Sequence, residues 1–173
     1  MADDIFHQNA DNQNGASFEL TTFLAGRTKA WGIFEDRFAR LRRRFSVEMN
    51  GQWREQVFHL DETFVYDTGE TETRTWRVMP TGQGRFTATC ADCIGEATGA
   101  CDADSIRMSY KFRLRMNKRS FVVDFDDRIY RMGNGIAVNR ATMRKWGVKL
   151  GELSLFFQRE DLDVAAIERR TAT

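Results

Sequence analysis

Segments in which apolar and polar residues alternate follow one another along most of this chain. In the clearest of them, one face is apolar throughout, consisting of Ile106, Met108, Tyr110, Phe112, Leu114 and Met116. Because successive side chains of a strand point to opposite faces, this pattern predicts a strand with one buried face. From Lys29 to Phe157 almost no helical periodicity competes with it. The chain is therefore predicted to be mostly β.

Five short turn sequences predict how these strands connect. In chain order they are Asn50-Gly51, Asp67-Thr68-Gly69, Asn117-Lys118, Gly133-Asn134 and Trp146-Gly147. Glycine and asparagine accept the positive φ that tight hairpin turns require. About nine or ten consecutive antiparallel strands result, and such a series loses its exposed edges by closing into an up-and-down barrel. We predict an all-β antiparallel barrel, with an open, strongly curved sheet or a sandwich as the alternative.

The length of 173 residues suits a single domain. Residues 1–16 are polar and are predicted to form a disordered leader, residues 17–160 the barrel domain with a short helical turn at its start, and residues 161–173 a tail with one short helix. The leader shows no basic segment followed by an apolar run, so a cytoplasmic location is expected. The formal net charge of +1 argues against a nucleic-acid binder.

Charged residues fall on the apolar face of several predicted strands. They are Arg43, Glu62, Arg74, Asp127 and Arg140. The second hairpin places Glu62 opposite Arg74, the fourth places Asp127 opposite Arg140, and the first leaves Arg43 without an acid opposite it. Buried charges are costly unless they pair with one another or meet a ligand. These five residues are therefore the strongest candidates for a site.

The other two hairpins order the apolar side chains of the same face. The third places Tyr110 opposite Phe125, and the fifth places Arg140 opposite Leu153. With the remaining inward residues, they predict an aromatic lining that consists of Phe58, Phe64, Tyr110, Phe112 and Phe125.

Together these residues predict a barrel that binds a small hydrophobic or amphipathic ligand. Three arginines against two acids leave one positive charge, and a guanidinium suits a carboxylate or phosphate. A fatty acid or another lipid-like anion would place its head at the five charges and its tail among the aromatic rings. The alternative interpretation is a structural ion-pair network that fixes strand register without any ligand.

An enzyme is the second class of function that the residues allow. Glu62 or Asp127 would act as a general base on a small hydrophobic carbonyl or carboxylate substrate, with the arginines stabilising an oxyanion. The facing arginines should lower the pKa of both acids and make them poor bases. No nucleophile, phosphate loop or metal cluster is recognisable. We therefore assign no catalytic residue and no cofactor, and favour binding over catalysis.

A third class is an interaction module whose barrel is filled by its own side chains. Its surface would be the basic stripe of Arg40, Arg42 and Arg44, or the surroundings of Trp31 and Trp53. An apolar patch outside a filled barrel would be its signature. The near-neutral charge of the chain favours a solvated face for the stripe.

Three cysteines, Cys90, Cys93 and Cys101, lie within one short segment. A C-x-x-C pair is found in metal and redox sites, but zinc usually needs four ligands, and His7 and His59 have no ligand spacing. We expect three small residues on neighbouring strands rather than a metal site. A Cys90–Cys101 disulfide is left open for an exported protein.

Several stretches resemble a bacterial family, domain of unknown function 3833 (DUF3833). They are FLAGRTKAWGIFEDR (23–37), RRRFSVEMNG (42–51), LDETFVYDTGETETRTW (60–76), DDRIY (126–130) and NRATMRKWGVKLGELSLFF (139–157). The resemblance implies a calycin-like, lipocalin-like barrel with a role at the cell envelope or in lipid handling, and it implies no reaction. Many relatives look like exported lipoproteins, which implies membrane association, although this sequence shows neither a lipobox cysteine nor a signal.

Overall fold

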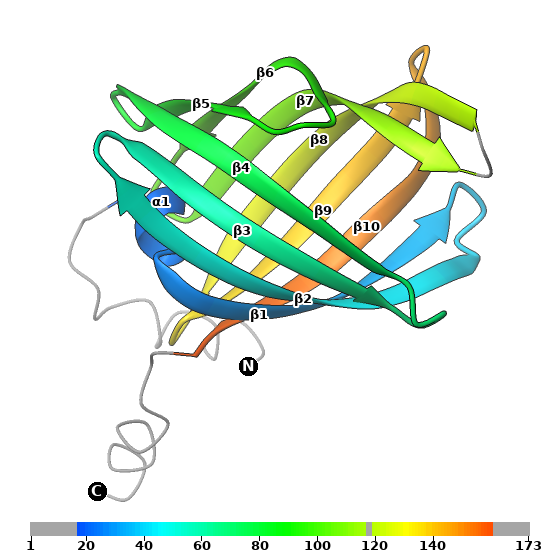
Figure 1. Ribbon diagram of the computed structural model, residues 1–173, viewed down its shortest axis with the longest axis horizontal. Coiled ribbons are helices and arrows are strands. Elements are labelled where there is room, and N and C mark those ends of the chain that lie inside the picture. Colours follow the sequence, from blue (N-terminus) through cyan, green and yellow to red (C-terminus); the bar gives the residue numbers. More distant parts are fainter. Residues whose placement is uncertain (1–16, 117–118, 161–173) are drawn as a thin grey trace, which may run out of the picture.

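Ten antiparallel strands close into one barrel in the computed structural model, which describes residues 17–116 and 119–160 (Figure 1). Each strand pairs with its neighbours in sequence, and the first pairs with the last to complete the ring. The elements are α1 (Leu20–Phe23), β1 (Gly26–Asp36), β2 (Leu41–Arg54), β3 (Val57–Tyr66), β4 (Thr71–Gly82), β5 (Arg85–Thr89), β6 (Cys93–Cys101), β7 (Ser105–Met116), β8 (Arg119–Gly133), β9 (Ile136–Lys145) and β10 (Val148–Arg159). The predicted all-β antiparallel up-and-down barrel is confirmed.

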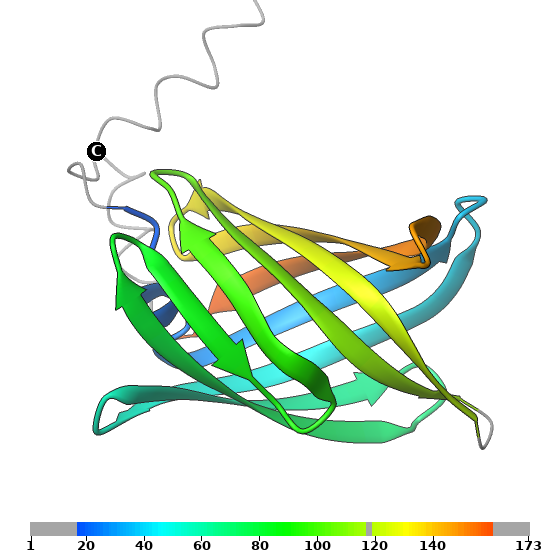
Figure 2. The ribbon, with the colours of Figure 1, turned by 90° about the horizontal axis from the view of Figure 1, so that it is seen from above.

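The two ends of the barrel differ. The turns that follow β1, β3, β5, β7 and β9 lie at one end, which we call the far end, and α1 lies at the other, the α1 end (Figures 1 and 2). The predicted helical turn packs Phe18, Phe23 and Leu24 into the barrel core. Its start is held to the β6–β7 turn, because the Phe18 N–H donates to the Asp102 carbonyl over 2.9 Å. The α1 end is therefore occupied by this short helix.

The second and third hairpins have the predicted register. Glu62 lies opposite Arg74, and Tyr110 lies opposite Phe125. The expected Asn117-Lys118 turn, the leader of residues 1–16 and the tail of residues 161–173 lie outside the described residues. Among the described residues, no helix has the length and apolar character needed to cross a bilayer.

The prediction of a turn at Asn50-Gly51 is wrong. β2 continues through both residues, and the chain turns after Arg54 at Glu55, where φ is +56°. Gly51 serves a different purpose, because its backbone lies against the segment that follows α1. A Cβ there would come within 2.0 Å of the Leu24 carbonyl oxygen. The glycine that suggested a turn instead permits close contact between α1 and the sheet.

The predicted pairings of Arg140 are also wrong. Arg140 lies opposite Arg128 rather than Asp127, and opposite Ser154 rather than Leu153. The strand register shifts between Arg131 and Gly133 in β8 and between Lys149 and Gly151 in β10. A bulge adds one residue to one strand, and a one-residue slip moves a side chain to the opposite face.

Replacing Gly51 by alanine is expected to lower the free energy of unfolding by about 1–3 kcal/mol, because the added Cβ overpacks a backbone contact. Urea unfolding of the variant measures the loss. Asn50→Ala, on the exposed side of the same strand, is the control and should change stability by less than about 0.5 kcal/mol. Equal stability of the two variants would show that the contact with α1 relaxes freely.

Candidate functional site

A group of polar side chains lies inside the barrel, contributed by five of its ten strands. This interior polar cluster consists of Glu62 on β3, Arg74 on β4, Tyr110 on β7, Asp127 on β8 and Asn139 on β9. Arg74 Nη1 lies 3.9 Å from Glu62 Oε2, and Asn139 Nδ2 donates to Asp127 Oδ1 over 2.7 Å. The cluster therefore consists of two linked halves, one around Arg74 and one around Asp127.

Arg74 is held between two aromatic rings. Its guanidinium carbon lies 4.9 Å from the ring centroid of Phe64 and 4.5 Å from that of Phe112. Arg74 Nη2 also donates to Glu72 Oε1 over 2.9 Å, and Glu72 accepts a further bond from the Tyr66 hydroxyl. Cation–π contacts and the ion pair together fix the guanidinium in one place. Its charge is already shared between Glu72 and Glu62.

Burial raises the pKa of both carboxyl groups of the cluster. The pKa of Glu62 rises to about 7, because burial outweighs the attraction of Arg74. The pKa of Asp127 rises to about 6, because burial outweighs the hydrogen bonds from Asn139 and Tyr110. The prediction that facing arginines lower these pKa values is wrong, since Arg74 is shared with Glu72 and Arg140 does not face Asp127.

Several polar atoms of the cluster lack a hydrogen-bond partner among the described residues. They are Glu62 Oε2, Arg74 Nε, Asp127 Oδ2 and Asn139 Oδ1. Buried polar atoms nearly always have a protein or water partner. Four such atoms in one cluster therefore provide unused hydrogen-bonding capacity on the inner wall of the barrel.

Some inward side chains beside the cluster are only partly buried. Buried side chains form two apolar groups, one that includes α1 and another around Phe112 and Phe125. Met108 packs against the first group, and Tyr110 and Leu153 pack against both. All three point inward but are only partly buried. A closed barrel that was completely filled would bury such side chains entirely. The inner wall next to these polar atoms is therefore partly accessible to solvent.

A family model described as "Protein of unknown function (DUF3833)" matches residues 5–159. The chain belongs to the DUF3833 family. Among solved structures, the chain is similar to the S-type phycobiliprotein lyase CPES from Guillardia theta, with a TM-score of 0.56 and 6% identity over 83% of this chain and 92% of that chain. At this identity the likeness shows the fold alone. No curated protein matches the chain.

The aromatic residues predicted to line the site all lie inside this DUF3833 barrel. Tyr110 stacks on Phe125 with their ring centroids 5.2 Å apart, and Phe112 meets Phe125 edge to face at 6.1 Å. Phe64 covers one side of Arg74. Phe58 is fully buried and belongs to the core beside α1. Phe64, Phe112 and Phe125 therefore lie around the interior polar cluster, of which Tyr110 is a member. Phe58 instead packs near the α1 end of the barrel.

Two of the five predicted charged residues do not join the cluster. The Arg140 side chain is 63% exposed on the outer surface and lies 3.4 Å from Glu152. The Arg43 side chain is 42% exposed at the far end, where its guanidinium lies over the Tyr66 ring and 3.4 Å from Glu70. The predicted surplus of positive charge is therefore absent from the interior. In the interior, the Arg74 guanidinium alone faces the carboxyl groups of Glu62 and Glu72 among the described residues.

Sequence reasoning missed two polar contributions to the cluster. A register without the bulge in β8 places the Asn139 side chain outside the barrel, whereas the shifted register turns it inward. Tyr110 was counted as an apolar residue, although its hydroxyl interacts with Asp127 and burial raises its pKa well above the usual value. A bulge signal near Gly133 is the only feature of the sequence that points toward Asn139.

The three cysteines carry free thiols. Burial raises the pKa of Cys90 and of Cys101 to about 11, so both are protonated at neutral pH. Across residues 17–116 and 119–160, no group of three or more histidine, cysteine or acidic side chains has the geometry to hold a metal ion. The C-x-x-C pair is not part of the interior polar cluster.

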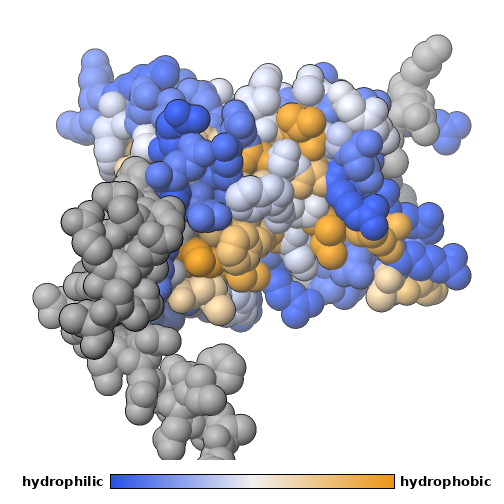
Figure 3. Space-filling model, turned by 90° about the horizontal axis from the view of Figure 1, so that it is seen from below, coloured by the Kyte–Doolittle hydropathy of each residue, from blue (hydrophilic) through white to orange (hydrophobic). Residues whose placement is uncertain are grey.

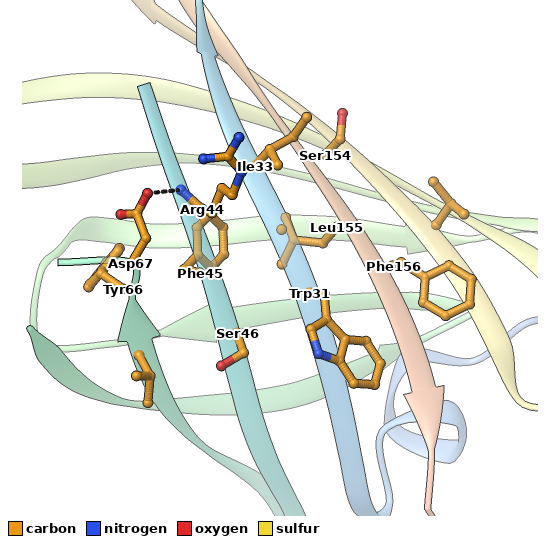
Figure 4. A pocket seen from close by; sticks show the side chains of 13 residues that line it. Trp31, Ile33, Arg44, Phe45, Ser46, Tyr66, Asp67, Ser154, Leu155 and Phe156 are labelled. Carbon is orange, nitrogen blue, oxygen red and sulfur yellow. Dashed lines mark hydrogen bonds between the residues drawn. The ribbon is translucent and has the colours of Figure 1, made fainter. Parts of the chain in front are cut away.

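A second concave region lies on the outside of the barrel (Figure 4). This outer groove has a volume of about 650 Å³. Strand register aligns its central row of side chains across five strands, in the order Val65, Ser46, Trp31, Phe156 and Val138. The Trp31 and Phe156 rings are 6.3 Å apart. The space-filling view from below shows apolar side chains among hydrophilic ones on this side (Figure 3).

Proposed function

We propose that this DUF3833 protein binds a small, mainly apolar molecule inside the barrel, with the polar head of the ligand at the interior polar cluster. The observation that carries the proposal is the set of four buried polar atoms without a hydrogen-bond partner, beside inward side chains that are only partly buried. Ligand sites are typically apolar cavities with a few convergent polar groups, and barrels of this class can enclose one ligand. The rings around Arg74 and Tyr110 would contact the apolar part of the ligand.

The charges of the cluster favour an uncharged head with hydrogen-bond donors, such as an alcohol or an amide. Glu62 and Asp127 offer oxygen atoms that a donor would satisfy. A carboxylate head would lie beside two acids, and Arg74 is already shared with Glu62 and Glu72. Like charges brought together in a buried site cost several kcal/mol. The fatty-acid anion expected from the sequence is therefore a weaker candidate than its alcohol.

A matched pair of substitutions on one strand tests where the ligand binds. Leu153→Trp fills the interior, where Leu153 contacts both apolar groups, whereas Ser154→Trp adds the same side chain to the outer groove. We expect the neutral fluorescent probe N-phenyl-1-naphthylamine to bind the parent and Ser154→Trp alike, and to bind Leu153→Trp at least about tenfold more weakly, because the indole excludes it. The reverse order would place the site in the outer groove and overturn the proposal.

Competition with two ligands of equal length tests the head group. At pH 8, dodecanol is expected to displace the probe at a concentration about tenfold lower than dodecanoate, because the carboxylate meets the negative charges of Glu62 and Asp127. Lowering the pH to about 5 protonates both acids and should reduce the difference. Tighter binding of dodecanoate at pH 8 would restore the anion hypothesis. Thermal melts of both tryptophan variants establish that they are folded.

One observation favours general acid–base catalysis as a second candidate. The pKa of Glu62 is about 7, and a general acid or base works best when its pKa is near the operating pH. Glu62 Oε2 also lacks a hydrogen-bond partner. Glu62→Gln distinguishes the two functions, because it removes proton transfer and retains a similar shape. Ligand binding without turnover in both proteins supports the binding function, whereas turnover that only the parent shows supports catalysis.

A further inference from the structure

Two hairpin tips at the far end expose large aromatic side chains. Trp146 in the β9–β10 turn is 89% exposed, and Phe38 in the β1–β2 turn is 64% exposed. The two hairpins are neighbours in the barrel, because the Arg37 N–H donates to the carbonyl of Leu150, near the start of β10, over 2.9 Å. An exposed aromatic at a single turn would be ordinary, but here two neighbouring hairpins expose one each at the same end of the barrel.

The backbone conformation of Trp146 gives no advantage to the fold. Its φ is +51°, a region that a bulky residue adopts only at a steric cost. Glycine or asparagine would suit this turn better, and the exposed indole gains no burial in return. Backbone strain without a packing benefit is a reason to look for a function outside the barrel.

Basic side chains lie close to the Phe38 and Trp146 rings. Arg37 and Arg40 lie 4.8 Å and 5.7 Å from the Phe38 centroid, and Lys145 Nζ lies 4.6 Å from the Trp146 ring. None of these three cations has a carboxylate partner within residues 17–116 and 119–160. The β2–β3 and β6–β7 turns at the α1 end instead carry Glu55 and the pair Asp102 and Asp104, with no aromatic residue at their tips.

We propose that these two tips dock the protein onto an anionic lipid bilayer. The docking surface consists of Arg37, Phe38, Arg40, Lys145 and Trp146. Tryptophan favours the interface between lipid head groups and acyl chains, and basic residues attract anionic head groups. The surface combines exposed aromatic rings with basic side chains at one end of the barrel. Because these cations have no carboxylate partner among the described residues, they favour an anionic bilayer over a bilayer without anionic lipids. In this orientation the β1–β2 and β9–β10 tips face the membrane, and the β3–β4 turn with Asp67 and Glu70 lies to one side of the docking surface.

Co-sedimentation with vesicles tests the proposal on the full chain. We expect binding to vesicles of phosphatidylcholine with phosphatidylglycerol, little binding to phosphatidylcholine alone, and loss of binding as salt rises from about 0.1 to 0.5 M. Trp146→Asn should weaken binding at least about tenfold. Asparagine suits the positive φ, so this variant folds at least as well as the parent.

Charge and position are tested separately. Arg37→Gln with Arg40→Gln should weaken vesicle binding on the order of 20-fold, because each basic residue near an anionic surface contributes about fivefold. The control is Met132→Ser, which removes a 62% exposed apolar residue from β8 near the α1 end and should leave binding unchanged.

No binding to anionic vesicles, or equal binding by Trp146→Asn and the parent, overturns the proposal and favours a protein partner for the tips. Probe binding inside the barrel should be the same in all these variants, so failure here is separate from failure of the proposed function.

Discussion

The free energy of unfolding of this protein is expected to fall by roughly 4 kcal/mol when the pH rises from about 5 to about 8. The cause is the pair of buried carboxyl groups in the interior polar cluster. The pKa of Glu62 rises from 4.5 to about 7, and that of Asp127 from 3.8 to about 6. Both groups therefore bind a proton more tightly in the folded state than in the unfolded chain. Stability is highest below the unfolded pKa values and is lost as the pH rises through the folded ones.

Urea unfolding at several pH values measures this slope. Glu62→Gln with Asp127→Asn should remove most of it and leave a variant more stable than the parent at pH 8, because uncharged amides replace buried charges. The control Glu48→Gln changes an exposed acid on β2 and should keep the slope of the parent. A parent whose stability is constant between about pH 5 and 8 would show that the two carboxyl groups are solvated in the folded state.

Arg74→Ala is expected to cost about 3–5 kcal/mol of unfolding free energy at pH 8, because it leaves Glu62 as a buried charge without its partner. It also removes the group that fills the space between Phe64 and Phe112. The loss should be smaller at about pH 5, where Glu62 is protonated and does not need a cation. Denaturant unfolding of the parent and variant at both pH values measures these differences.

Two further variants separate the causes. Arg74→Met keeps an unbranched side chain between the rings but removes the charge, so its loss at pH 8 should exceed its loss at about pH 5. Arg140→Ala removes an exposed arginine on the outer surface and should cost less than about 0.5 kcal/mol. If Arg74→Ala costs no more than Arg140→Ala, or costs the same at both pH values, the ion pair with Glu62 is not a stabilising contact.

The alternating strand pattern and two of the turns were sufficient to predict the barrel and one of the two ion pairs expected in its interior. The face that contains Ile106 and Phe112 points into the barrel as its alternation indicated, and the Asp67-Thr68-Gly69 turn correctly placed Glu62 opposite Arg74. Both inferences depend on local chemistry, namely the two-residue period of a strand and the φ preference of turn residues. Local rules succeed wherever a hairpin is regular.

These local rules failed where the strands are irregular. Gly51 looks like a turn residue, but the approach of Leu24 requires a glycine there. Arg140 appeared to face Asp127, but shifts near Gly133 and Lys149 turn it outward and bring Asn139 to the acid instead. Bulges depend on how a whole sheet curls and closes, so no single hairpin sequence reveals them.

The sequence by itself determined that this chain forms an antiparallel barrel with charged residues on its inner face, because alternation and turn chemistry act over a few neighbouring residues. Only the tertiary structure decided which charges are inside and in what protonation state. Closure of the barrel leaves Arg74 with Glu62 and Glu72 and raises the pKa of Glu62 and Asp127 by burial. Register shifts place Arg140 on the outer surface, and Arg43 lies partly exposed at the far end. Burial and long-range register arise from the complete ring of strands, which is why they could not be read from its separate segments.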